Sequence, residues 1–425
     1  MGLREFLSKL TGVAGVNMAE KLAGLVLGVL LVRWLGTETY GLYAFVMALV
    51  SLGMIATVVG LPQWLLREVA SNRDRPEDLA GRRAEKRVLV LVAASGAAWI
   101  VIGSGILMAA MTPGPLRSAL LLALWLLAAN ALLRTMGHAL RAWSQEVRAQ
   151  FLTSLVPTAG AAGLVAVLYL GLGSEGTATQ AIAARGVAIV AALIVAAALL
   201  LRIERPAPGA AAEPHRYGAI LRGAFPFMLI GSAAIVLQRT DVIMLGFLSS
   251  FTETGIYRIG AQGAALIQLA LVTANVVAVP QFARFHAAGD KVALERFAIM
   301  AARLAFVAGF VVAVVLTVFG ATLLELFFGA EAIAAWPAMM ILSWGFALSL
   351  AFGEPGFLLN MSGHETVTLK VMAGGAALNI VLNAIAIPLA GAEGAAAATV
   401  LSLLGQRFVM SGMVRRRIGI SCRIV

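Results

Sequence analysis

The sequence predicts an all-α polytopic membrane protein, with about twelve transmembrane helices in two parallel six-helix halves. Three observations carry this prediction: an apolar composition, long apolar runs that recur along the chain, and short motifs that return in its second half. Hydrophobic residues make up 61% of the 425 residues, charged residues make up 12%, and the mean hydropathy is +0.93. About a quarter of the residues in a soluble domain are charged, so this composition excludes an ordinary soluble domain.

Apolar runs recur along the whole chain, and each is long enough to cross a hydrocarbon core of about 30 Å as a helix. The predicted spans are residues 13–33, 41–65, 88–111, 117–139, 151–171, 178–201, 223–247, 256–281, 304–328, 335–360, 371–390 and 393–413. The connections are short, and the longest are basic segments around 66–87, 202–222 and 282–303. None of them has room for an extramembrane domain.

The first ten residues, MGLREFLSKL, have the pattern of a short amphipathic helix. Leu3, Phe6, Leu7 and Leu10 are spaced to share one helix face, which indicates a helix lying in the membrane interface. No small-residue cleavage site follows the first hydrophobic run, so we do not expect a cleaved export signal. Cys422 is the single cysteine of the chain, which excludes an intrachain disulfide and a cysteine-based metal site.

Lysine and arginine residues are distributed unevenly between alternate loops. Most of the 32 basic residues fall at the N-terminus, in every second loop and in the C-terminal tail, whereas the turns at 37–40 and 250–254 have none. The positive-inside rule therefore predicts that both termini are cytoplasmic and that these two turns are external. Topology and anionic membrane lipids then account for the net charge of +11, and the dispersed basic residues argue against a nucleic-acid partner.

A polar motif occurs twice, as TETYGLY at 37–43 and as TETGIY at 252–257. The copies are six predicted spans apart, and two further pairs keep this offset: LPQW at 61–64 with VPQF at 279–282, and Gly-His at 137–138 with Gly-His at 363–364. Because six is even, both halves have the same orientation, which predicts parallel repeats with a substrate path between them. Chance recurrence of loop residues is the alternative.

This duplication predicts three parts of the chain. They are an N-terminal six-helix bundle with its amphipathic helix at 1–203, a cytoplasmic linker at 204–217, and a C-terminal six-helix bundle at 218–425.

Two stretches carry a resemblance to a known family: RWLGTETYGLYAF at 33–45 and LNIVLNAIAIPLAGAEGAAAATVLS at 378–402. With them, nearly the whole chain resembles the polysaccharide-biosynthesis (Wzx-like) flippases of the multidrug/oligosaccharidyl-lipid/polysaccharide exporter superfamily. The resemblance implies two six-helix bundles that form a V-shaped, alternately opening cavity.

The substrate implied by the resemblance is an undecaprenyl-diphosphate-linked oligosaccharide, moved from the cytoplasmic to the outer leaflet for the assembly of O-antigen, capsule or exopolysaccharide. The resemblance also implies the bacterial inner membrane as location, and it is compatible with association with polysaccharide assembly proteins.

Polar residues inside apolar spans are functional candidates, because they are expensive at bilayer depth. On the first span, Asn17 and Lys21 share a helix face with two glycines, and Glu20 lies at its edge. Lys21 on this face could meet a diphosphate. The alternative is a helix-packing face, with Lys21 extended to the membrane surface or paired with Glu20.

The seventh span contains Gln238, Arg239 and Asp241. Arg239 and Asp241 are two residues apart, so they point in different directions and cannot neutralise each other across one face. We expect Arg239 and Lys21 to bind the diphosphate in a shared cavity, with Asp241 holding Arg239 or exchanging partners. A structural ion pair that holds the bundle together is the alternative. Gln238, Asn17 and Gln262 are the neutral candidates for substrate binding.

The sequence GEPG at 353–356 predicts a break in the tenth span, because Pro355 interrupts a helix and glycines flank the pair. Glu354 is then a candidate for a hinge or for coordination of a coupling ion, although the break could simply bend the helix. Glu20 on the first span is a second candidate for ion coupling. Coupling to a Na⁺ or H⁺ gradient or to the membrane potential is compatible with these residues. No resident cofactor or metal is expected.

Catalytic motifs are missing from the sequence. There is no cluster with metal-ligand spacing and no phosphate-binding loop of the ATPase type, so we predict that the chain is not an enzyme. Two other functions stay open. A cation or drug antiporter of the same superfamily would show an acidic cavity, and a membrane oligosaccharide polymerase or ligase would need a large outer loop.

Overall fold

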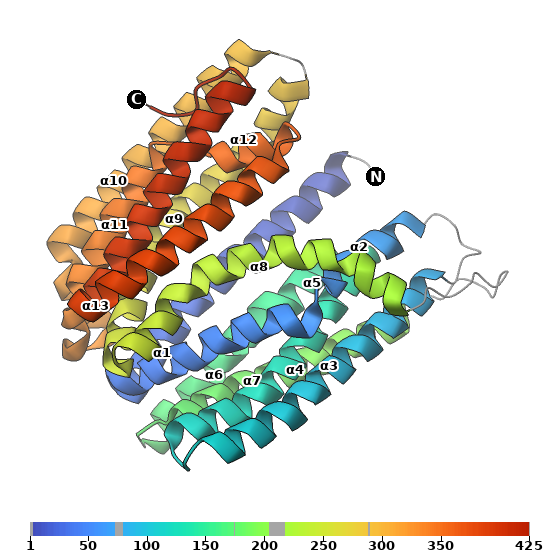
Figure 1. Cartoon of the computed structure of the whole chain (residues 1–425), viewed down its shortest axis with the longest axis vertical. Coiled ribbons are helices and arrows are strands. Elements are labelled where there is room, and N and C mark those ends of the chain that lie inside the picture. Colours follow the sequence, from blue (N-terminus) through green and yellow to red (C-terminus); the bar gives the residue numbers. More distant parts are fainter. Residues whose placement is uncertain (1–2, 73–79, 174, 204–216, 288–289, 425) are drawn as a thin grey trace. The chain divides into compact units, whose positions relative to one another are not determined.

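The computed structural model describes residues 3–72, 80–173, 175–203, 217–287 and 290–424 (Figure 1). These residues form helices and no strand. The first part of the chain forms α1 (Leu3–Val58), α2 (Leu61–Asn72), α3 (Ala80–Ala110), α4 (Pro115–Ala142), α5 (Glu146–Gln150), the π-helix η1 (Phe151–Leu155), α6 (Val156–Leu172) and α7 (Ala178–Arg202). The rest forms α8 (Tyr217–Leu248), α9 (Phe251–Ala287), α10 (Lys291–Phe328), the 3₁₀-helix η2 (Ala330–Ala335), α11 (Trp336–Leu350), α12 (Pro355–Met361) and α13 (Glu365–Arg417).

In the described part of the chain, 8 helices are long and apolar enough to cross a membrane. The protein is therefore a multi-pass membrane protein. Two of these helices contain a break: Gly36 in α1 has φ 72° and ψ 169°, and Ala390 and Gly391 interrupt α13. Each break separates two spans that the sequence predicts. The total of twelve spans and their grouping into two bundles stay predictions.

The chain divides into two compact units. Unit 1 comprises Met1–Leu35 and Val46–Ile235, and unit 2 comprises Gly36–Phe45 and Val236–Val425. The division passes through α1 and through α8, so the short segment 36–45 packs with the second half of the chain. Nearly all of the predicted linker, 204–217, lies outside the described residues, and the predicted domain boundaries stay predictions.

Helix α4 lies at the centre of unit 1. It packs along both α3 and α7, and α6 packs on the other side of α7 (Figure 1). Small residues make these contacts close: a Cβ at Gly96 would come within 2.9 Å of Ala128, and one at Gly160 within 2.9 Å of Ala188. Close approach of small residues is a common way to join membrane helices, because the hydrophobic effect gives little drive for association in lipid.

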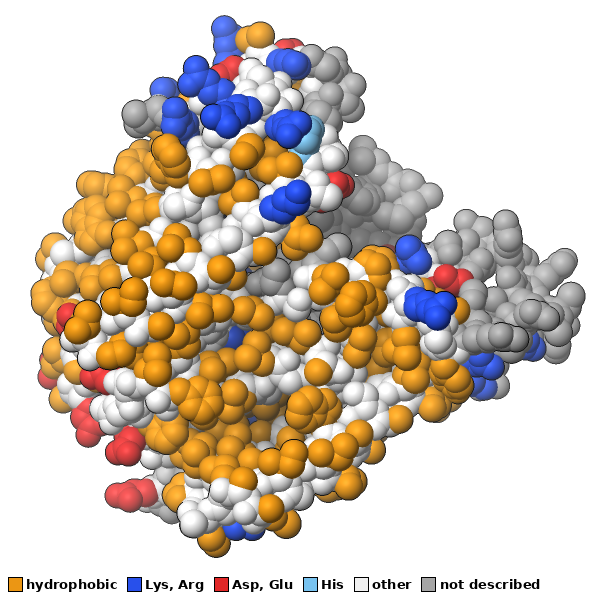
Figure 2. All heavy atoms as spheres, viewed as in Figure 1, with side chains coloured by type: hydrophobic (Ala, Val, Ile, Leu, Met, Phe, Trp, Pro, Cys, Tyr) orange, Lys and Arg blue, Asp and Glu red, His pale blue; other side chains and the backbone are white. Residues whose placement is uncertain are grey.

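Unit 2 is built mainly from α9, α10, α11 and α13, which pack against one another. Its two ends differ in charge. Figure 2 shows Lys and Arg side chains gathered at the end where the chain terminates, and Asp and Glu side chains at the opposite end. Glu325 lies in the last turn of α10, Glu331 lies in η2 and Glu393 follows the break in α13, and all three are exposed, whereas residues 415–417 form the last turn of α13. The positive-inside rule associates such a basic end with the cytoplasm.

The two copies of the repeated motif contact each other within unit 2. A Cβ at Gly41 would collide with the backbone carbonyl of Phe251, and a Cβ at Gly255 would collide with that of Thr37. Only glycine allows the start of the second leg of α1 and the start of α9 to approach this closely. The Glu253 carboxylate also accepts a hydrogen bond of 2.7 Å from the backbone N–H of Ala392, at the break in α13. The motif therefore recurs at a helix-to-helix contact.

The C-terminal tail folds back onto unit 2. The N–H of Ile424 donates to the carbonyl of Ala351 at 2.9 Å, and the N–H of Ser421 donates to Glu295 Oε1 at 3.0 Å. Cys422 is buried between them in a hydrophobic cluster with Phe282 and other side chains of α10, α12 and α13. This burial raises the pKa of the Cys422 thiol to about 11.

Candidate functional site

A polar stripe runs along α4 in unit 1. Asn130, Arg134, His138 and Arg141 follow one another at intervals of four, four and three residues, so they lie on one face of the helix. The helix is otherwise apolar enough to cross a membrane. The Arg134 side chain is exposed, between the buried Leu133 and Thr135. Because an arginine facing lipid is expensive, this stripe is expected to face water or a polar ligand.

Arg185 extends the stripe from the neighbouring helix. It lies about 10 Å from the start of α7, well inside a helix of 25 residues. Both Arg185 and Arg141 are close enough to act electrostatically on the Arg134 guanidinium. None of the three arginines Arg134, Arg141 and Arg185 was singled out from the sequence as a candidate for binding.

Among the described residues, no acidic side chain balances the positive charges of this stripe. The Nε of Arg185 is buried and has no hydrogen-bond acceptor among the described residues. None of the described residues forms an ion pair with Arg134 or Arg185. Like charges repel, and a buried donor without an acceptor is costly, so this arrangement favours a bound anion.

An amide bridge connects the stripe to α1. Arg141 Nη2 donates to Gln150 Oε1 at 2.7 Å, and Gln150 Nε2 donates to Asn17 Oδ1 at 2.6 Å and to Ser154 Oγ at 3.0 Å. Asn17, a predicted substrate-binding residue, therefore lies next to the cationic stripe.

Gln150 is followed directly by the π-helix η1. Pro157 accounts for this local change, because it has no N–H to donate to the carbonyl of Thr153 and its ring crowds that carbonyl. Single π turns within α-helices are frequent at functional sites.

The other predicted residues of α1 have a different setting. Lys21 is exposed and Glu20 is half-buried, and no described residue forms a hydrogen bond or ion pair with either side chain. Lys21 belongs to unit 1 and Arg239 to unit 2. A cavity shared by these two cations stays a prediction.

A buried carboxylate organises the core of unit 2. The Asp241 side chain on α8 is only 5% exposed. Its Oδ2 accepts hydrogen bonds from the Tyr257 hydroxyl at 2.7 Å and from Thr399 Oγ1 at 2.8 Å, while its Oδ1 accepts one from Asn383 Nδ2 at 2.6 Å. In this structure the partners of Asp241 are neutral groups and do not include Arg239.

Two further amide contacts extend this network along α13. Asn383 Nδ2 also lies 3.1 Å from Asn379 Oδ1, and Asn379 Nδ2 donates to Ser402 Oγ at 3.3 Å. Asn379 and Asn383 precede the break at 390–391, whereas Thr399 and Ser402 follow it. The network therefore joins both legs of α13 to α8 and α9.

The chemistry of the network suits a hard cation better than a transition metal. Its oxygens come from one carboxylate, amides and hydroxyls, and the Asn383 Oδ1 is buried without a hydrogen-bond donor among the described residues. No group of three or more His, Cys, Asp or Glu side chains that could hold a metal occurs in the described part of the chain.

The remaining predicted residues of unit 2 lie near this network in sequence. Gln238 is exposed and Arg239 is half-buried. The Gln262 amide oxygen accepts a hydrogen bond of 3.3 Å from the Tyr40 hydroxyl, which again joins the segment 36–45 to α9.

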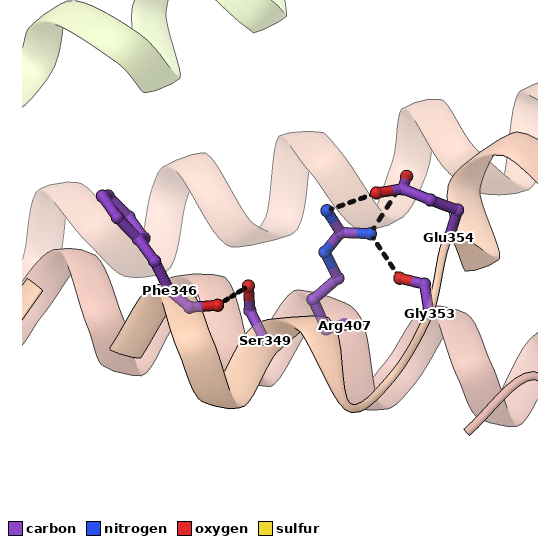
Figure 3. Close-up of polar contacts among 5 residues, drawn as sticks. All are labelled: Phe346, Ser349, Gly353, Glu354 and Arg407. Atoms are coloured by element: carbon purple, nitrogen blue, oxygen red, sulfur yellow. Dashed lines mark hydrogen bonds and ion pairs between the residues drawn. The ribbon is translucent and has the colours of Figure 1, made fainter. Parts of the chain in front are cut away.

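The predicted helix break at GEPG is present. It separates α11 from α12, and Gly353 at this break has φ 66°. Figure 3 shows the Glu354 carboxylate facing Arg407 of α13, with Oε2 and Nη1 3.3 Å apart. Arg407 Nη1 also donates to the Gly353 carbonyl at 3.0 Å, one of the carbonyls freed by the break. Glu354 is thus paired with Arg407, which was not among the predicted site residues, and ion coordination by Glu354 stays a prediction.

Asp241→Asn is expected to destabilise unit 2. The substitution keeps the shape of the side chain but turns one acceptor into a donor, which then faces the hydroxyls of Tyr257 and Thr399 or the amide of Asn383. A hydrogen bond to a charged group contributes about 1.5–3 kcal/mol, so a loss of this order is expected. Thermal unfolding of the purified protein measures it, with the exposed Gln238→Ala as control. If Asp241→Asn unfolds at the same temperature as the wild type, the Asp241 network does not stabilise unit 2 as described.

The family model described as "Polysaccharide biosynthesis protein" matches residues 7–286. The chain belongs to this family. The family predicted from the sequence is thereby confirmed.

This polysaccharide biosynthesis protein shares its fold with transporters of the MOP superfamily. It superposes on an inward-facing multidrug resistance MATE family transporter with a TM-score of 0.75 at 15% identity, covering 94% of both chains. It also superposes on the lipid II flippase MurJ in an inward closed conformation, with a TM-score of 0.74 at 10% identity, covering 95% of this chain and 87% of the other. These proteins are transporters and flippases rather than enzymes.

Two further membrane proteins show similarity to the chain. A MOP superfamily transporter from Pyrococcus furiosus, described as having a binding pocket of reversed polarity, gives a TM-score of 0.58 at 16% identity over 96% of this chain and 94% of the other. An uncharacterized membrane protein of Methanocaldococcus jannaschii is 35% identical over 89 residues, which are 21% of this chain and 17% of the relative. The chain thus matches about a sixth of that relative's length.

Proposed function

We propose that this protein is a flippase that moves an undecaprenyl-diphosphate-linked oligosaccharide from the cytoplasmic to the outer leaflet by alternating access. The observation that carries the proposal is the pair of intramembrane arginines, Arg134 and Arg185, without a described acidic partner. A diphosphate with about two negative charges cannot cross an apolar midplane uncompensated, and guanidinium groups offer it bidentate contacts.

The family and the fold support this proposal. The family description concerns polysaccharide biosynthesis, and one protein of the same fold is a lipid II flippase. Assembly of O-antigen, capsule or exopolysaccharide at the bacterial inner membrane, with both termini in the cytoplasm and assembly proteins nearby, is the corresponding setting. The alternative of a cation or drug antiporter has less support, because the polar stripe of unit 1 is cationic.

In this proposal the coupling ion binds in unit 2, at the Asp241 network. The Asp241 network offers the oxygen ligands that Na⁺ requires, and its hydrogen bonds join both legs of α13 to α8 and α9. Binding of Na⁺ or H⁺ to Asp241 would loosen some of these hydrogen bonds and so change how the helices pack. Glu354, which is already paired with Arg407, is a weaker candidate for this role.

Transport in liposomes tests the proposed function. The purified protein is reconstituted with a defined undecaprenyl-diphosphate glycan, and the glycan exposed on each leaflet is measured with an impermeant lectin. Glycan should cross the bilayer with its length unchanged, which also excludes a polymerase or ligase. Transport of an organic cation without any movement of the glycan would overturn the proposal in favour of the antiporter.

A further inference from the structure

An open crevice of about 550 Å³ lies at the basic end of unit 2. The last turns of α13 and one tail residue line it: Phe408, Val409, Gly412, Met413, Arg415, Arg416 and Arg423. A second crevice of about 320 Å³ shares Phe408 and Arg423 and extends to the end of α11 at Ala351 and Phe352. Together they form one groove, the tail groove.

The apolar wall of the tail groove continues along an exposed face of α13. Phe408 is 60% exposed, and Leu401, seven residues earlier on the same face, is 57% exposed. Arg415 follows seven residues after Phe408. In a membrane protein, an apolar face of this size is expected to contact lipid chains. Here the arginine Arg415 follows at the end of the same face.

The arginines of the tail groove have no acidic counterpart in the part of the chain that the structure describes. No Asp or Glu is among the described residues that line the two crevices. Arg415 and Arg416 are exposed and Arg423 is half-buried, and none of the described residues forms an ion pair or hydrogen bond with their guanidinium groups. The nearby Arg407 is different, because it pairs with Glu354.

The backbone of the tail holds Arg423 in place. The residues on either side of it are anchored, since Cys422 is buried in the hydrophobic cluster and Ile424 is hydrogen-bonded to Ala351. The Cys422 carbonyl also lies against Gly353, at the break between α11 and α12. Three positive charges are therefore gathered around an apolar groove at the end of the unit predicted to be cytoplasmic.

We propose that the tail groove binds an anionic phospholipid of the surrounding bilayer. Its phosphate contacts Arg415, Arg416 and Arg423, and its acyl chains lie along Phe408 and Leu401. A free phosphate would leave the apolar wall uncovered, whereas a phospholipid matches both the wall and the charges. The bound lipid holds the tail against the α11–α12 break. This site is independent of the proposed transport function.

Lipid retention by the full-length protein tests the site. Protein purified in detergent is incubated with phosphatidylglycerol or phosphatidylcholine, and bound lipid is measured by native mass spectrometry. The wild type should retain phosphatidylglycerol in preference to phosphatidylcholine. Arg416→Gln should reduce phosphatidylglycerol retention about fivefold, the effect expected for one basic residue at an anionic lipid surface. The matched control is Arg417→Gln, which removes the same charge from an exposed neighbour outside the groove and should leave retention unchanged.

Cys422 provides a second readout in the same protein. It is the single cysteine, it is buried under the tail, and its labelling by a maleimide requires the tail to detach. Phosphatidylglycerol should slow this labelling in the wild type and in Arg417→Gln, and should slow it much less in Arg416→Gln.

Equal retention of phosphatidylglycerol and phosphatidylcholine by the wild type would overturn the proposal. An equal loss of phosphatidylglycerol retention in Arg416→Gln and Arg417→Gln would also overturn it, because it would show a general effect of surface charge. So would displacement of phosphatidylglycerol by inorganic phosphate or by the lipid-linked glycan at equal concentration.

Discussion

Replacing Arg134 and Arg185 together by alanine is expected to abolish transport of the lipid-linked glycan while the protein still folds. Each guanidinium would contribute a charge-assisted contact to the diphosphate, worth about 1.5–3 kcal/mol, so each single replacement should slow transport at least tenfold. Loss of both guanidinium groups should reduce transport of the lipid-linked glycan to the background rate. The measurement is glycan movement in liposomes, at equal amounts of inserted protein.

Thermal stability separates this binding role from a structural one. Arg134 and Arg185 repel each other and have no described acidic partner, so their removal should leave the unfolding temperature unchanged or raise it. Arg117→Ala on the same helix is the control, because its guanidinium donates to the Met111 carbonyl far from the stripe, and transport should persist. Normal transport by the double variant, or its failure to fold, would contradict the assignment.

Alanine at Gly41 or Gly255 is expected to prevent stable folding of unit 2. At each position the added Cβ would overlap a backbone carbonyl of the facing helix, and neither backbone can move without displacing its whole helix. A loss of more than about 3 kcal/mol is expected, at the upper end of what overpacking produces. The yield of monodisperse protein after detergent extraction, and its unfolding temperature, report this loss.

Gly105→Ala is the matched control for these two variants. Gly105 lies inside α3, and a Cβ there would meet nothing within 4 Å. Alanine has the higher helix propensity, so this variant should be as stable as the wild type or more stable by up to about 1 kcal/mol. Wild-type stability of both Gly41→Ala and Gly255→Ala would show that the two copies of the motif do not pack as described.

Most of the helices and their breaks could be predicted from hydropathy and from the positions of glycine and proline. The breaks at Gly36, at Gly391 and at GEPG each separate helices that the sequence divides at the same place, because glycine and proline act on the backbone locally. The close contact of Gly41 with Phe251 could not be predicted, since it joins residues more than two hundred positions apart. The repeat marked these residues without showing that they touch.

The residues that form the candidate sites were harder to predict from the sequence than the helices. Asp241 stood out because a charge within an apolar span is conspicuous, but its partner was expected to be Arg239, and the structure supplies Tyr257, Thr399 and Asn383 instead. The spacing of Asn379 and Asn383, four residues apart in an apolar helix, was the available signal.

The cationic stripe was hidden for a different reason. Arginines near helix ends were assigned to the membrane surface by the positive-inside rule, which treats charge as a topological marker only. Arg185 is a single cation in an Ala-rich helix, and its significance depends on α7 lying along α4. The spacing of Asn130, Arg134, His138 and Arg141 on one face would have indicated the stripe.

The central claim is that arginines of unit 1 neutralise the anionic headgroup during transport. The most direct measurement compares two glycolipids in liposomes containing the wild-type protein: one undecaprenyl chain joined to its glycan through a diphosphate, and one joined to the same glycan through a neutral linker. The account predicts that the diphosphate lipid crosses at least tenfold faster, and that this preference disappears in the Arg134→Ala/Arg185→Ala variant. Equal rates for the two lipids in the wild-type protein would contradict it.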